Sequence, residues 1–223
     1  DATGADDGTS WANAFTFLDT ALSSAAVNDQ IWVAEGTYTA RDSFLSLIII
    51  FPITRDIELY GGFDGTETML SQRDPSQHIT ILSGDVNGDD IAGDFQNNRT
   101  DNRDAISFIA DSISTATIID GFTFRGGHAA STTYNGASAM GITGSPRIRN
   151  CIFTNNYASN MGGAVVIASP NAVYAVIEDC TFSENKSGGV GGAINILDVS
   201  QDGDPLQIIN CTFNDNEANN TGG

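Results

Sequence analysis

An oxygen-rich stretch at residues 85–104 holds the side chains best spaced for metal chemistry. It begins with a D-x-N-x-D pattern, which turns alternate carboxylate and amide oxygens toward one point, and oxygen is the ligand that Ca²⁺ prefers. The candidate ligands are Asp85, Asn87, Asp89, Asp90 and Asp94. The pattern departs from an EF-hand loop because Asp90 and Gln96 replace its sixth-position Gly and twelfth-position Glu. We predict a Ca²⁺ site in this loop, which would otherwise repel itself, with a solvated acidic loop as the alternative.

Other residue types that serve in catalysis are present, but their spacing predicts little. His78 and His128 have no Ser or Cys partner nearby in the sequence, so no catalytic triad is expected. Arg125, Arg147 and Arg149 lie close together in the sequence. They could supply a base or a sugar contact, but a solvated surface role is the simpler interpretation.

A sequence repeat defines the elements that must position these groups. Each copy contains a Cys, any residue and a Phe, followed three residues later by an Asn. The copies occupy residues 148–156, 177–185 and 208–216. Their phenylalanines are 29 and 31 residues apart, and a Gly-Gly pair follows each one nine residues later. Apolar residues alternate at period two, as in half-buried strands, so the fixed period predicts an all-β parallel β-helix, a solenoid of stacked coils.

Stacking of these coils would place like residues on like, about 4.8 Å apart. The predicted interior columns are Cys151, Cys180 and Cys211; Phe153, Phe182 and Phe213; and Asn156, Asn185 and Asn216. Asn tolerates left-handed backbone angles at a turn and can hydrogen-bond along a stack. The cysteines are expected to be free, buried thiols that act as small apolar residues.

A weaker copy of the repeat spans residues 118–127, where Phe124 lies 29 residues before Phe153. In this alignment Gly121 takes the cysteine position and one residue is inserted. The corner position before the cysteines then collects Asp120, Asn150, Asp179 and Asn210. Carboxylates separated by amides repel one another less than adjacent carboxylates do, so the pattern favours a structural role over the clustered acids of a glycosidase.

One domain, residues 1–223, is expected to contain the whole chain. We divide it into a cap at 1–30, irregular early coils at 31–117 and regular coils at 118–223. Short apolar runs predict strands at 57–61, 79–82, 105–109, 164–167 and 193–196.

The open end of a solenoid exposes its core, so a covering element is expected there. Ser10 is a candidate N-cap for a helix over residues 10–26. The apolar stripe on one face of this helix is Trp11, Phe15, Leu18, Leu22 and Ala25. At the other end the chain stops on Gly222-Gly223, where another strand is expected. We therefore expect this chain to be part of a longer solenoid, or that end to be covered by another chain.

The charge balance is strongly acidic, with 9 Lys and Arg against 28 Asp and Glu, for a net charge of −19. Such a charge disfavours binding to nucleic acid and to anionic membranes. No run of 18 apolar residues predicts membrane insertion. The acidity favours either cation binding or simple solubility of an extended surface.

The sequence resembles bacterial secreted proteins with a right-handed, pectate-lyase-like parallel β-helix, including choice-of-anchor and polymorphic outer-membrane adhesin-like proteins. The segments that carry the resemblance are Asp7–Trp11, Asp29–Tyr38, Leu59–Glu67, Ser71–Asp74 and Thr80–Asp85, together with the Cys-x-Phe repeats. The resemblance implies export to the cell surface or the extracellular space. It implies no particular reaction, because most members of this group have no assigned activity and fold does not dictate function.

The leading functional hypothesis is a non-enzymatic extracellular module: an adhesin, a surface-filament segment or a structural stalk. The alternatives are a polysaccharide lyase or glycoside hydrolase, and a glycan-binding module of a larger secreted enzyme. Expected partners are an extracellular glycan or another surface protein, with end-to-end or lateral self-association. Outward-facing aromatics would favour a glycan partner, and the residues to inspect are Tyr38, Tyr134, Tyr157 and Tyr174. An Arg and two carboxylates in one cleft would favour an enzyme.

Overall fold

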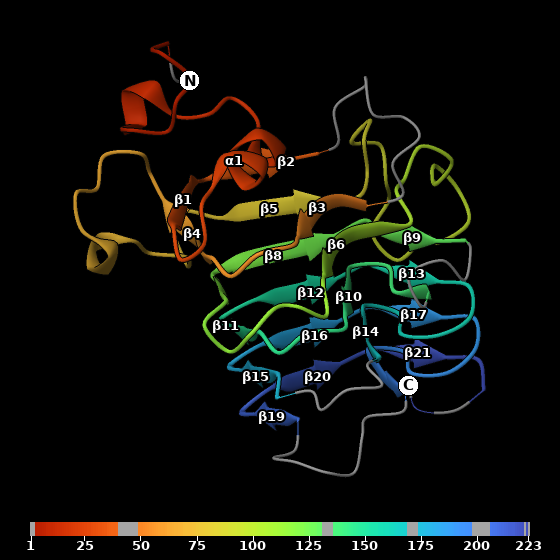
Figure 1. Ribbon diagram of the computed structural model, residues 1–223. Helices are drawn as coiled ribbons and strands as arrows, with labels where there is room; N and C mark the ends of the chain where they lie inside the picture. The colour runs from red at the N-terminus through yellow and green to blue at the C-terminus, as the bar shows by residue number, and fades with distance from the viewer. Residues whose placement is uncertain are drawn as a thin grey trace.

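The computed structural model is an all-β parallel β-solenoid of about 6 turns (Figure 1). It describes residues 3–39, 49–130, 136–168, 174–197, 206–220 and 222. Four sheets, named A to D here, run along the stack, and every strand pairs in parallel with its equivalent in the next coil. The predicted fold class is therefore confirmed.

The strands of sheets A and B form two adjoining sides of the solenoid. Sheet A contains β1 (Gln30–Ala34), β4 (Glu58–Phe63), β7 (Ile118–Asp120), β11 (Arg147–Arg149), β15 (Val176–Glu178) and β19 (Gln207–Ile209). Sheet B contains β2 (Gly36–Tyr38), β5 (Thr80–Ser83), β8 (Phe122–Arg125), β12 (Ile152–Thr154), β16 (Thr181–Ser183) and β20 (Thr212–Asn214).

Sheets C and D complete the coils. Sheet C contains β3 (Ile49–Ile53), β6 (Ala105–Ile109), β10 (Met140–Ile142), β14 (Val165–Ala168) and β18 (Ile194–Leu197). Sheet D contains the short strands β9 (His128–Ala129), β13 (Tyr157–Ala158), β17 (Lys186–Ser187) and β21 (Glu217–Ala218). The five strand regions expected from short apolar runs correspond to β4, β5, β6, β14 and β18.

Interior columns run through the regular coils as the repeat predicts. The rings of Phe124, Phe153, Phe182 and Phe213 stack with successive centroid distances of 4.9, 4.8 and 5.0 Å. Phe153 and Phe182 are fully buried, whereas Phe213, in the last described coil, is 50% exposed. Cys151 and Cys180 are buried beside this column.

The asparagine ladder closes a buried turn next to the phenylalanines. The side-chain amide of Asn156 donates to Asn185 Oδ1 at 2.9 Å, and that of Asn185 donates to Asn216 Oδ1 at 2.9 Å. Each of these amides also donates to a carbonyl of the preceding coil, that of Phe124 or Phe153. The left-handed backbone falls one residue earlier, at Asn155, Glu184 and Asp215, rather than at the ladder positions.

The alignment of the first regular coil requires a correction. Ile119 pairs with Ile148 and Phe124 with Phe153, so both segments are equally long and no residue is inserted. Gly121 consequently occupies the position of Asn150, and both have positive φ, of 83° and 51°. Phe122, which is 1% exposed, takes the cysteine position. The sequence alignment failed because it matched Asp120 to Asn150 by polarity.

The N-terminal cover is shorter than the single predicted helix. Residues Trp11–Asn13 form a 3-10 turn, for which Ser10 is the N-cap, because its hydroxyl accepts a hydrogen bond from Asn13 N. The chain is then extended until α1 (Leu18–Ser24), which packs against β3 and β1 at one end of the stack (Figure 1). The non-helical break occurs because Trp11 packs at a tilt against Phe63 instead, with 5.5 Å between the ring centroids, and because Thr16 N donates to the Asp6 carboxylate.

Candidate functional site

The acidic loop at 85–104 connects β5 to β6 and lies against the edge of sheet D (Figure 1). His128 N, in β9, donates to Arg103 O at 2.9 Å, so the end of the loop continues the coil pairing. Gly93 N donates to Asn155 Oδ1 at 2.7 Å, and Asn102 donates to Gly126 O at 2.6 Å. The loop is thus attached to the solenoid at several points.

Three of the predicted metal ligands gather at the start of this loop. Asp85, Asp89 and Asp90 each offer a carboxylate oxygen, and these oxygens lie within 4.8 Å of one another. The Asp85 carboxylate also organises the turn, since it accepts hydrogen bonds from Gly88 N at 2.6 Å and Asp90 N at 3.2 Å. This geometry could hold a hard cation, with carboxylates supplying the charge.

The other two predicted ligands have different surroundings. Asn87 is exposed, and its backbone N–H donates to Asp101 Oδ2 at 2.9 Å. The Asp94 carboxylate closes a separate turn by accepting hydrogen bonds from Gln96 N and from the Asn97 amide. These hydrogen bonds, the Asn97 side chain first, lower the pKa of Asp94. The D-x-N-x-D spacing therefore predicted the Asp85–Asp89 approach, while Asn87 and Asp94 stay predictions.

An internal cation offsets the self-repulsion expected of the loop. The buried Arg99 guanidinium donates to Asp90 Oδ2 at 2.6 Å and to Asp94 O at 2.9 Å. It also lies 5.3 Å from the ring centroid of Phe95. Sequence reasoning missed this role, because the spacing of Arg99 from its partners follows no regular element.

Two buried oxygens at this site have no hydrogen-bond donor within the described part of the chain. They are Asp90 Oδ1 and Asn102 Oδ1. Burial raises the pKa of Asp90 to about 6, although the hydrogen bond from Asn102 and the charge of Arg99 act in the opposite direction. Unpaired buried acceptors are costly, and a bound cation would satisfy them.

A second charged cluster occupies the outer face of sheet A. Its central residue, Asp120, does not lie at the corner position that the sequence alignment predicted for it. Asp120 lies in register with Arg149 and Tyr60, not with Asn150. Its carboxylate is 1% exposed and lies 2.6 Å from Arg73 Nη2 and 2.6 Å from Arg149 Nε.

Asn150 also donates to the Asp120 carboxylate, at 3.1 Å. Both oxygens are therefore occupied, so this carboxylate stabilises the coils and is poorly placed to act as a base. At the true corner position Asn210 donates to Asp179, which supports the structural interpretation of that ladder.

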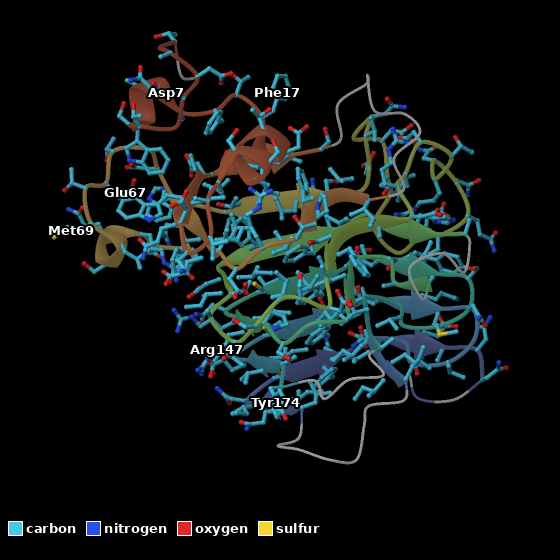
Figure 2. The ribbon with its side chains drawn as sticks, viewed as in Figure 1. Asp7, Phe17, Glu67, Met69, Arg147 and Tyr174 are labelled. Carbon is cyan, nitrogen blue, oxygen red and sulfur yellow. The ribbon has the colours of Figure 1, made fainter. Side chains whose placement is uncertain are left out.

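The remaining sequence candidates are dispersed. Arg125 lies on β8 in register with Thr154, on a different sheet from Arg147 and Arg149. Figure 2 shows Arg147 on the outer surface beside β11, where its guanidinium is 3.6 Å from Glu178 Oε1. His78 Nδ1 lies 3.0 Å from Glu35 Oε2, and this hydrogen bond raises the pKa of His78.

A groove with a volume of about 530 Å³ separates the acidic loop from sheet D. Residues 92–96 form one wall, and Tyr157, Lys186 and Asn219 form the other. No spacing pattern in the sequence predicts this groove, since its two walls are about 60 residues or more apart along the chain. The sequence feature that could have indicated the groove is Phe95, an aromatic residue within an acidic loop.

The tyrosines named as indicators of glycan binding differ in their surroundings. Tyr157 is half-buried in the groove wall, and Tyr174 is 41% exposed beside sheet A. Tyr38 donates its hydroxyl to Ala34 O at 3.1 Å, and burial raises its pKa. Tyr134 lies outside the described residues.

The fold places the chain in the class of parallel β-solenoid proteins. Comparison with protein-family models, with curated proteins and with solved structures found no match. Within the described residues, no helix is both long and apolar enough to cross a membrane.

Proposed function

We propose that this chain is a non-enzymatic module that acts outside the cell or on its surface, as an adhesin, a surface-filament segment or a structural stalk. The observation that supports this best is the phenylalanine column, which continues through four coils with centroid distances of 4.9, 4.8 and 5.0 Å. A core that is continuous along the axis couples each coil to its neighbours and resists bending. Such a rod is suited to holding the acidic loop at a fixed distance from the surface to which the protein is attached.

The surface charge is compatible with this role. A net charge of −19 keeps an extended surface hydrated and disfavours nucleic acid and anionic membranes as partners. The proposed partners are an extracellular glycan or another surface protein, together with end-to-end or lateral association between copies.

Ca²⁺ is the cofactor that we propose for the acidic loop. Asp85, Asp89 and Asp90 would supply carboxylate oxygens, and the Asn102 amide oxygen lacks a donor beside them. Arg99 already neutralises one side of Asp90, so the ion would act on the opposite, unpaired oxygen. Binding of Ca²⁺ would make the loop stiffer and less negative.

The location is tested with an antibody raised against residues 136–220 and applied to intact and lysed cells of the source organism. If the protein is on the cell surface, intact and lysed cells should label equally, and protease treatment of intact cells should remove the label. If it is secreted, the protein should be recovered from the medium. Labelling of lysed cells alone would contradict the proposal.

The absence of catalysis is tested separately on a panel of neutral and acidic polysaccharides, with and without Ca²⁺. The expected result is no release of reducing ends or unsaturated uronides. Release that disappears on replacement of Arg125, Arg147 or a loop aspartate would instead support the lyase or hydrolase alternative.

A further inference from the structure

The groove between the acidic loop and sheet D has the size of a small-ligand site. Its volume of about 530 Å³ lies within the range typical of ligand pockets. One wall, at residues 92–96, is irregular loop, and the other is built from the regular coils through Tyr157, Lys186 and Asn219. The groove therefore has one wall held by the pairing of the coils and one wall formed by an irregular loop.

The aromatic part of the groove is held in place before any ligand arrives. The rings of Phe95 and Tyr157 stack at 5.8 Å, and Tyr157 also contacts the His128 ring at 4.8 Å. On its other side Phe95 lies against the Arg99 guanidinium, at 5.3 Å. The neighbouring Gly93 is tied to Asn155 by a 2.7 Å hydrogen bond. Preorganised walls lower the entropic cost of binding.

Three polar groups that line the groove have no hydrogen-bond partner among the described residues. They are the Tyr157 hydroxyl, the Gln96 amide and the Asn219 amide. Together they offer both donors and acceptors. The Lys186 ammonium, by contrast, is already paired with Glu217, at 3.0 Å to each carboxylate oxygen.

We propose that this groove binds a neutral saccharide. The side-chain amides and the phenol suit hydroxyl groups. The faces of the two rings pack on each other, on Arg99 and on His128, so a sugar would meet only their edges. Asp94 in the wall and Glu217 beside it would repel an anionic ligand, while the pairing of Lys186 leaves little positive charge to attract one. The inference deepens the proposed surface role by naming a ligand class for it.

The test is calorimetric titration of the purified chain with four neutral hexasaccharides, cellohexaose, maltohexaose, xylohexaose and mannohexaose, and with hexagalacturonate as the acidic probe. At least one neutral sugar is expected to bind and hexagalacturonate is not. Asn219→Ala and Gln96→Ala, which alter exposed side chains, should together weaken binding about tenfold, equal to about 1.4 kcal/mol. Tyr157→Phe, which keeps the ring, should weaken it less.

Tyr174→Ala is the matched control, because this exposed tyrosine lies beside sheet A (Figure 2), whereas the groove lies beside sheet D. It should leave the affinity unchanged, and melting curves should show every variant folded. The proposal is overturned if no neutral sugar binds, if only hexagalacturonate binds, or if the Asn219 and Gln96 variants bind like the wild type. Sugar binding by a protein found only inside cells would refute the surface location and leave the groove assignment intact.

Discussion

The regular coils and the acidic loop satisfy their buried polar groups in opposite ways. In the coils, each Asn of the ladder is completed by the identical residue of the next coil. In the loop, two unlike residues, Arg99 and Asn102, donate to Asp90, and among the described residues two buried oxygens remain unpaired. Repetition thus pairs the ladder amides of the coils with one another, although His128 Nδ1 in β9 and Asn195 Nδ2 in β18 lack a partner in the part of the chain that the structure describes. The irregular loop keeps unpaired carboxylate and amide oxygens that a cation can use.

Replacing a ring within the phenylalanine column tests the scaffold and has the largest expected effect. Phe182→Ala should cost about 3–5 kcal/mol of unfolding free energy, because it leaves a cavity in a fully buried stack. Phe213→Ala is the matched control from the same column and should cost much less, since Phe213 is 50% exposed. Chemical denaturation measures both, and equal costs would contradict the dependence on coil-to-coil stacking.

Removal of one ladder amide comes next. Asn185→Ala should cost about 2–4 kcal/mol, because it orphans the buried N–H of Asn156 and the carbonyl of Phe153. Asn214→Ala, on the exposed strand β20, should cost little. If the two variants unfold at the same denaturant concentration, the ladder is not a major source of stability.

The loop should respond to the loss of its internal cation. Arg99→Met should cost about 2 kcal/mol, less than most buried pairs, because the Asp90 side chain is 12% exposed and keeps its hydrogen bond from Asn102. Hydrogen exchange should show the loss concentrated in 85–104, with the phenylalanine column still protected. Adding Asp90→Asn should restore part of the stability, and no restoration would contradict the pairing.

Ca²⁺ should stabilise the same loop by a smaller amount. At free Ca²⁺ ten times the dissociation constant, the folded state gains about 1.4 kcal/mol, and chelator reverses the gain. Asp89→Asn should abolish the rise in melting temperature, whereas Asp111→Asn, at an exposed position outside the loop, should preserve it. An unchanged melting temperature in the wild type would count against the site.

The smallest effect is expected from the cysteines, which are free thiols in the structure. A hydrogen bond with Cys151 and burial both raise the pKa of Cys180, and burial raises that of the partly exposed Cys211. Alkylation of the native protein should therefore label Cys211 first, and unreduced, denatured protein should carry three labels. Reducing agent should leave the melting temperature unchanged. A Cys151–Cys180 linked peptide would refute this prediction.

The same contrast between coils and loop explains what the sequence could predict. The columns were predictable because a repeat compares the chain with itself, and parallel stacking turns equal sequence positions into contacts. The misplacement of Asp120 and Gly121 occurred where one coil departs from the pattern, and only strand register resolves it. The single helix predicted over 10–26 was wrong because an apolar stripe indicates only which residues are buried. Trp11 packs against Phe63 without being part of an α-helix.

The candidate site was only partly predictable. Alternate spacing brought out Asp85 and Asp89, since residues two and four apart can converge within one turn. The Arg99 bonds and the groove depend on how an irregular loop folds back on the coils, and no local pattern records that path. Gly93 and Asn155, for example, are 62 residues apart along the chain but share a hydrogen bond.

The fixed step of the phenylalanine column has an evolutionary consequence. Duplication or deletion of one unit, 29 or 31 residues long here, would change the length of the rod by a single ring-to-ring distance, 4.8 Å between Phe153 and Phe182. Every remaining coil would still pack against an equivalent coil. Recombination within the gene can therefore change the length of the rod one coil at a time without changing the packing of the core. The acidic loop between β5 and β6 would keep its structure, while its distance from the far end of the rod would change by one coil.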